Sequence, residues 1–163
     1  MSNAKEQQKT RPKMDEIVGT ILVGENLENA SNLMAFCKEN KMSLRWASLN
    51  CWQFYFKSKR IGQIRITDKD NSWTFSPWNS VDTIETLTAN DIKAKDIVWS
   101  SVKLCNNCCN CGPGHDRIVF DKMFEKVCHG WFRMTNPNEA TIDFIKQMLK
   151  EKMSQLAIAT SKH

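Results

Sequence analysis

The strongest constraint on the fold is an alternation of apolar and polar residues in the first half of the chain. Aromatic residues alternate with Gln, Tyr and Lys over residues 52–57, and isoleucines alternate with Gln and Arg over residues 63–66. This period of two is typical of β-strands with one buried and one exposed face. Polar turns at 57–60 and 68–72 separate the runs. The pattern predicts three or four antiparallel strands whose apolar face must be covered by helices.

Helices that can cover this face are also predicted from the spacing of apolar residues. Apolar residues recur at helical spacing in three segments, at about 27–40, 89–104 and 137–153. Asn136 and Pro137 fit the N-cap and the first position of the last helix, whereas residues 14–24 fit a strand or a helix equally well. These patterns predict an α+β fold: an antiparallel sheet of four to six strands packed by three helices, with a Cys-rich loop.

The length of 163 residues fits one domain with short tails. We expect a flexible tail at 1–13, a single α+β domain at 14–156 and a frayed C-terminus at 157–163. The formal net charge is +5. The tail holds four of the basic residues and one acidic residue, so the rest of the chain is close to neutral.

Two absences bear on the compartment. The first residues lack the apolar core of a secretion signal, and the most apolar early run, Ile17–Val23, is too short to span a bilayer. We therefore expect a cytoplasmic protein with no membrane partner. In a reducing compartment, free thiols or metal-bound thiolates are expected rather than disulfides, and the odd total of seven cysteines agrees with this.

Cysteines supply the clearest chemical signal in the chain. Five of the seven fall within 24 residues, and the first of them follow the spacing C-x2-C-x2-C before Gly-Pro-Gly. Thiolates held close together by a tight, glycine-rich turn suit a tetrahedral metal ion, and four protein ligands would make the site structural. Cys109 is left over, because adjacent cysteines do not readily face the same ion. The predicted Zn²⁺ ligands are Cys105, Cys108, Cys111 and Cys128.

Other interpretations of the same residues remain open. His115 or His129 can replace one thiolate as a ligand. The spacing is also that of a [4Fe–4S] cluster, although the fourth cysteine is distant and no proline follows it. A third possibility is thiol redox chemistry, which the predicted position of Cys105 at the C-terminal end of a helix disfavours. Reduced cysteines that bind nothing are the fourth.

The chain contains none of the common enzyme motifs H-E-x-x-H, G-x-S-x-G or G-x-G-x-x-G, so the sequence favours a non-enzymatic role. Basic residues do interleave with an aromatic residue on the polar side of the predicted sheet, a pattern that single-stranded nucleic acids can use. One aromatic is fewer than such surfaces normally carry, so a solvated face and a protein partner are preferred to nucleic acid. The residues are Arg45, Tyr55, Lys57, Lys59, Arg60 and Arg65.

Several landmarks between Phe36 and Lys150 are shared with one family. They are Trp46-x5-Trp52, Trp73-x-Phe-x-Pro77, the C-x2-C-x2-C-Gly-Pro-Gly loop, Phe120 with Phe124, Val127-Cys128 and Asn136-Pro137. On these, the chain resembles a family of small Firmicutes proteins of unestablished function. That family has Phe-Gly-Lys where this chain has Phe120-Asp121-Lys122, and Cys109 is not typical of it. The resemblance implies that Cys105, Cys108, Cys111 and Cys128 form the functional set, and it brings no activity.

The sequence thus predicts a zinc-stabilised, non-enzymatic binding or regulatory module in the cytoplasm. The alternative is a thiol or iron–sulfur redox protein or sensor, whose site must be partly exposed.

Overall fold

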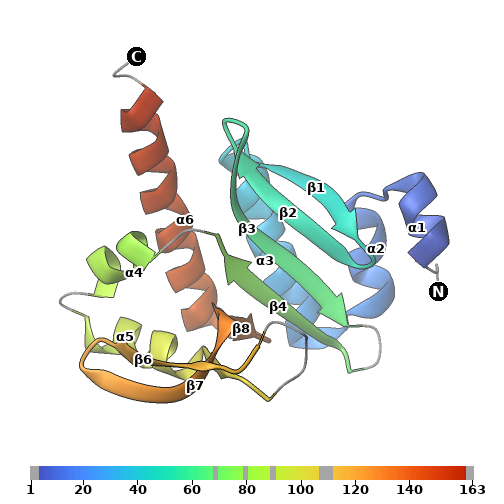
Figure 1. Cartoon of the computed structure of the whole chain (residues 1–163). Helices are drawn as coiled ribbons and strands as arrows, with labels where there is room; N and C mark the ends of the chain where they lie inside the picture. The colour runs from blue at the N-terminus through green and yellow to red at the C-terminus, as the bar shows by residue number, and fades with distance from the viewer. Residues whose placement is uncertain (1–3, 68–69, 79–80, 89–90, 107–111, 161–163) are drawn as a thin grey trace.

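The computed structural model describes residues 4–67, 70–78, 81–88, 91–106 and 112–160. Within these ranges the chain forms six helices and two antiparallel sheets (Figure 1). The large sheet has five strands in the order β1-β2-β3-β4-β8, and the small sheet has three in the order β5-β7-β6. The predicted α+β class and the antiparallel sheet are confirmed. Three helices were expected where six occur, and the second sheet was not anticipated.

The large sheet is the predicted meander with one strand added. Short turns join its first four strands, and β8 pairs with β4 at the edge. Lys57 and Ser58 form the β2–β3 turn with φ of 44° and 64°, and such left-handed pairs match the twist of a hairpin. The strands are β1 (Ser43–Ser48), β2 (Cys51–Phe56), β3 (Lys59–Thr67), β4 (Ser72–Pro77) and β8 (Met134–Thr135).

Helices cover one face of the large sheet. α2 (Met14–Ile21) and α3 (Gly24–Glu39) lie behind β1–β4 in Figure 1, and α6 (Glu139–Thr160) packs against α3. The segment 14–24 with two possible patterns is therefore mainly helical, and α6 extends beyond its predicted end. The aromatic residues of the alternating strands face these helices and are fully buried; they are Trp52, Phe54, Trp73 and Phe75.

The N-terminal segment differs from the expected flexible tail. Residues Ala4–Thr10 form helix α1, and Gln7 is only 1% exposed. The Gln7 side chain donates to Asn50 Oδ1 at 2.6 Å and accepts from the Asn50 N–H at 2.9 Å and from Trp46 Nε1 at 3.2 Å. These bonds fix α1 to the β1–β2 turn. The segment looks solvated in the sequence because its contacts with the sheet are hydrogen bonds to residues about 40 positions away along the chain.

The small sheet lies beside helices α4 (Val81–Thr88) and α5 (Ile92–Ser100). Its strands are β5 (Val102–Leu104), β6 (His115–Val119) and β7 (Lys122–Phe132). The sequence predicted a helix through residue 104, but α5 ends at Ser100 and residues 102–104 pair with β7 instead. Trp99 at the end of α5 donates through Nε1 to Val119 O at 2.7 Å. This bond ties the helix to the β6–β7 hairpin.

Candidate functional site

Two of the four predicted zinc ligands lie within the described residues. Cys105 directly follows β5 and is half-buried, and Cys128 lies in β7 and is 6% exposed. Cys108 and Cys111, and also Cys109, lie outside the described residues. Among the residues that are described, no three His, Cys, Asp or Glu side chains are grouped to hold a metal ion. Because Cys105 follows a strand, the helix-end reasoning against a reactive thiol does not apply to it.

Irregular pairing between β5 and β7 brings Cys105 close to the Cys128 segment. Leu104 pairs with Val127, and the Cys105 N–H donates to Lys126 O at 2.6 Å. The next pair along the ladder is Val102 with Phe132. One residue of β5 therefore faces four residues of β7, 128–131, so this segment forms a large, irregular bulge in the strand. The bulge carries Cys128 near one end of the cysteine loop.

Both ends of the cysteine loop meet on β7. The Cys105 thiol contacts the Gly112 carbonyl oxygen at 3.9 Å. A Cβ atom added at Gly114 would lie 2.6 Å from Cys105 Cβ and would overlap the backbone of Lys126. Gly112 has φ of +86°, which a side chain would disfavour. The Gly-Pro-Gly sequence therefore allows the chain to return to the point where it left β5.

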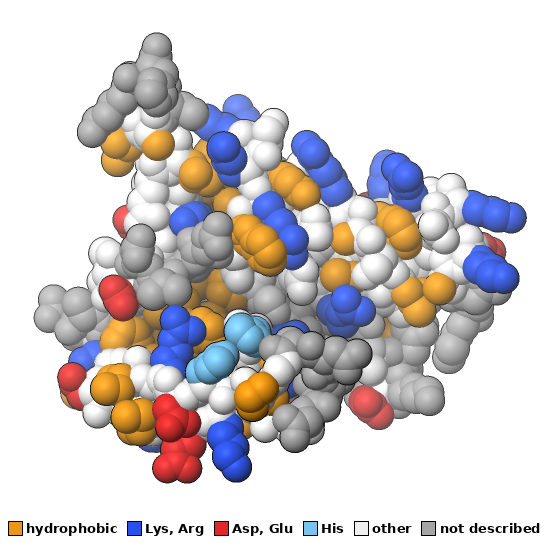
Figure 2. All heavy atoms as spheres, viewed as in Figure 1, with side chains coloured by type: hydrophobic (Ala, Val, Ile, Leu, Met, Phe, Trp, Pro, Cys, Tyr) orange, Lys and Arg blue, Asp and Glu red, His pale blue; other side chains and the backbone are white. Residues whose placement is uncertain are grey.

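Two histidines lie beside this junction. His115 pairs with Val127 across the β6–β7 ladder, and its ring meets the edge of His129 at 5.1 Å between centroids. Both side chains are exposed and form the pale blue patch in Figure 2. With Asp116 and Cys128 they line a depression of about 300 Å³. The Asp116 carboxylate accepts from the Lys126 N–H at 3.0 Å and so holds this residue in its left-handed conformation, φ 53°, at a separate irregularity of the β6–β7 ladder.

The two cysteines outside the cluster are structural. Cys37 on α3 is fully buried, and burial raises the pKa of its thiol to about 12. It therefore remains a protonated, inert thiol at neutral pH. Cys51 on β2 is also buried. Cys37 is therefore a small apolar residue of the core.

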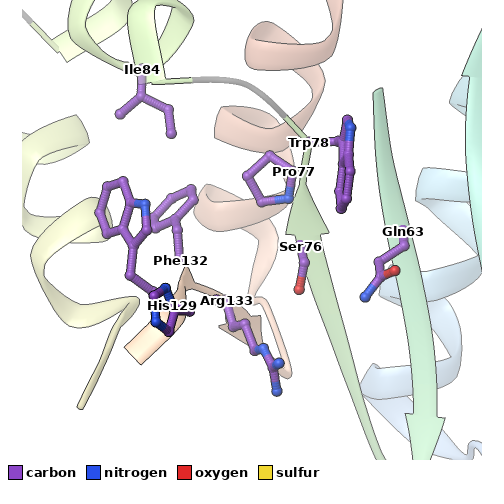
Figure 3. Close-up of a pocket in the computed structure, with 10 residues that line it drawn as sticks. Gln63, Ser76, Pro77, Trp78, Ile84, His129, Phe132 and Arg133 are labelled. Atoms are coloured by element: carbon purple, nitrogen blue, oxygen red, sulfur yellow. The ribbon is translucent and has the colours of Figure 1, made fainter. Parts of the chain in front are cut away.

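A cleft between the two sheets was not foreseen from the sequence. It measures about 370 Å³ and lies between the end of β4 and the bulged end of β7 (Figure 3). Trp78, which is 45% exposed, stands on the β4 side, with the Arg60 guanidinium 3.7 Å above its ring. The lining residues are Gln63, Ser76, Pro77, Trp78, Ile84, His129, Gly130, Trp131, Phe132 and Arg133.

Only weak signals in the sequence point to this cleft. Its two walls come from segments about 50 residues apart, and no motif links them. Trp78 is the one hint, since Trp is enriched at binding interfaces. The bulge that aims residues 129–133 at the cleft depends on a register that periodicity does not reveal.

No protein-family model matches the chain, and neither a curated protein nor a solved structure is detectably similar to it. The resemblance to the Firmicutes family therefore stays a prediction. Among the described residues, no helix combines the length and the apolar character needed to cross a bilayer. The function must accordingly be inferred from the junction of the cysteine loop with β7 and from the adjoining cleft.

Proposed function

We propose that this chain is a zinc-stabilised, non-enzymatic binding module of the cytoplasm. Zn²⁺ held by Cys105, Cys108, Cys111 and Cys128 fastens the loop between β5 and β6 to the bulge of β7. The observation that carries the proposal is the meeting of both loop ends with β7 next to Cys128, through the Cys105 N–H bond to Lys126 and the close approach of Gly114. Thiolates are preferred ligands of Zn²⁺.

The weak burial of the small sheet supports a need for such a cross-link. Ile118 and Met123 are 66% and 58% exposed, and most residues of β6 face solvent. Val119, Val127 and Phe132 are buried, but hydrophobic packing holds the outer part of the β6–β7 hairpin less firmly than it holds the large sheet. A structural metal contributes directly to folding where apolar burial is small.

A metal at Cys128 would also affect binding in the cleft. Cys128 begins the bulge, and the residues that follow it, 129–133, form one wall of the cleft. A metal bound at Cys128 would fix that wall relative to β4. A rigid wall lowers the cost of ordering side chains when a partner binds.

Elemental analysis of anaerobically purified protein, with thiols counted before and after denaturation, tests the proposal. We expect about one zinc per chain and four metal-bound thiols protected until unfolding, as a closed four-thiolate site requires, in addition to the buried thiols of Cys37 and Cys51. Cys128→Ser should lower both metal content and melting temperature. Cys51→Ser is the matched control, because Cys51 is also a buried strand thiol, and it should retain the metal. Metal-free protein in which Cys105 and Cys128 titrate freely would overturn the proposal.

An iron–sulfur or thiol redox role is the second candidate. The C-x2-C-x2-C spacing and the half-buried position of Cys105 support it. The same purification discriminates between the two, because an iron–sulfur protein is brown and a zinc protein is colourless.

A further inference from the structure

The face of the large sheet opposite its helices is open and basic. Strand alternation places Arg45, Tyr55 and Arg65 on this face, away from the buried aromatic residues. Several Lys and Arg side chains lie on the corresponding surface in Figure 2, where few Asp or Glu side chains are seen. Residues 41–67 contain six Lys and Arg and no Asp or Glu. This segment alone exceeds the net charge of the whole chain, +5.

The arginines of this face have no anionic partner within the described part of the chain. Arg45, Arg60 and Arg65 form no ion pair with a described carboxylate; the pair that the structure shows joins Lys146 to Asp143, on α6. Arg60 Nε is buried and has no hydrogen-bond partner among the described residues. Guanidinium groups without an internal ion pair favour the binding of a polyanion, because no ion pair must first be broken.

Two of these guanidinium groups lie over aromatic rings. Arg45 is 4.4 Å from the centroid of Tyr55, and Arg60 is 3.7 Å from that of Trp78. Stacking on a ring leaves the N–H edge of a guanidinium available for a phosphate oxygen. Arg60 is held further by a hydrogen bond from Nη2 to Gln63 Oε1, a residue that also lines the cleft. The Arg60 guanidinium and the Trp78 ring are therefore held in place before any ligand binds.

The structure supplies the aromatic residues that the sequence pattern lacked. Tyr55 is the one aromatic on the polar side of the predicted strands, but Trp78 lies at the end of β4 and Trp131 lines the same cleft. Arg117 lies 4.5 Å from the Trp131 centroid, which repeats the pairing of arginine and ring. Two or three rings beside a basic groove are typical of surfaces that bind unpaired bases.

We infer that the open face of the large sheet and the adjoining cleft bind single-stranded nucleic acid. One base enters the cleft and stacks on Trp78, and the backbone phosphates follow the arginines of the sheet. The cleft volume of about 370 Å³ lies within the range of small-ligand sites. An acidic protein would also pair with the arginines, but it would leave the exposed rings without a stacking partner. The inference rests on the proposed function in one respect: the proposed zinc would hold the β7 residues that form one wall of the cleft.

Fluorescence anisotropy on the full, metal-loaded chain tests the inference, with labelled oligo(dT) and oligo(U) of about 12 nucleotides, within the span that single-strand surfaces bind. We expect binding that weakens as salt rises, because phosphate contacts release counterions. Trp78→Ala should weaken binding about 5- to 100-fold, the effect of losing one stacked base. Trp78→Phe should recover part of that loss. Because Trp78 is 45% exposed and lies outside the core, circular dichroism should show an unchanged fold.

Charge variants test the path of the backbone. Arg45→Ala with Arg65→Ala should weaken binding and reduce the steepness of its salt dependence. Lys38→Ala is the matched control, since Lys38 is exposed on α3, which covers the opposite face, and it should bind as the wild type does.

Three results would overturn the inference: no binding of either oligonucleotide at low salt, equal affinity for a duplex of the same length, or equal affinity for uridine monophosphate alone. A chain that purifies without metal and still binds oligonucleotides would refute the zinc proposal and leave this inference standing. A zinc-loaded chain that fails to bind would refute the inference alone.

Discussion

The two sheets of this protein are held together in different ways. The large sheet buries Trp52, Phe54 and Phe75 completely against helices, and Phe54 and Phe75 are in ring contact at 5.6 Å between centroids. The small sheet buries Val119, Val127 and Phe132 but exposes Ile118 and Met123, and its pairing contains an irregular bulge. Side-chain burial is therefore more complete in the first sheet than in the second, where the proposed metal would add a cross-link.

Turn chemistry does not explain this difference. Each sheet has a hairpin with two non-glycine residues at positive φ, Lys57-Ser58 in the large sheet and Phe120-Asp121 in the small one. Both hairpins tolerate the same local strain. The two sheets differ in how completely their faces are buried, and variants of each sheet can measure this difference.

The largest effect is expected for a core aromatic of the large sheet. Phe75→Ala should lower the free energy of unfolding by about 3–5 kcal/mol, because it removes a fully buried ring and leaves a cavity. Ile118→Ala in the small sheet should change it by less than about 0.5 kcal/mol. Urea unfolding of both variants measures the contrast. Equal losses would show that a partner or second copy buries the small sheet.

Gly114 tests the junction of the loop with β7. Gly114→Ala should destabilise the protein by about 3 kcal/mol, because the new Cβ overlaps the Lys126 backbone. Gly19→Ala is the control: nothing lies within 4 Å of the added atom, and Ala favours α2 by roughly 0.5–1 kcal/mol. Thermal unfolding with metal analysis should show loss of stability and metal only in the first variant. A Gly114→Ala protein with wild-type values would mean that the loop ends need not meet.

Gln7 tests whether the N-terminal helix belongs to the large sheet. Gln7→Ala should cost about 2 kcal/mol, because Asn50 would lose its buried partners. Gln8→Ala, at an exposed site on the same helix, should be nearly neutral. Chemical denaturation compares them, and equal stability of the two variants would restore the expectation of a flexible tail.

The smallest effects are expected in the hairpin turns. Ser58→Gly and Asp121→Gly should each stabilise the protein by about 0.5–1 kcal/mol, because glycine adopts positive φ without strain. The gain should be smaller for Asp121, since Asp tolerates this conformation better than Ser. Melting temperatures check both changes. A destabilising glycine at either position would indicate a side-chain contact that outweighs the strain.

Much of the large sheet could be predicted from the sequence, and little of the small one. Period-two alternation located β2 to β4 because one face of each strand is buried and the other is not. β6 is largely exposed on both faces, so it leaves a weak periodic signal. Val102–Leu104 continued a helical pattern, yet pairing with β7 determined their conformation.

The candidate site divides in the same way. The cysteine spacing named Cys105 and Cys128, and the structure brings their segments together at Lys126. The bulge and the pairing of Arg60 with Trp78 had no signal in the order of residues, and the cleft had only the weak signal of Trp78 itself.

By itself, the sequence determined that β2 to β4 are strands, where the covering helices α3 and α6 lie and which thiols are candidate ligands. Those properties follow from local periodicity and residue chemistry. Only the tertiary structure decided that Gln7 docks on Asn50, that residues 102–104 form a strand and that Trp78 and Trp131 share a cleft. Each of these depends on contacts between distant segments, which no local pattern encodes.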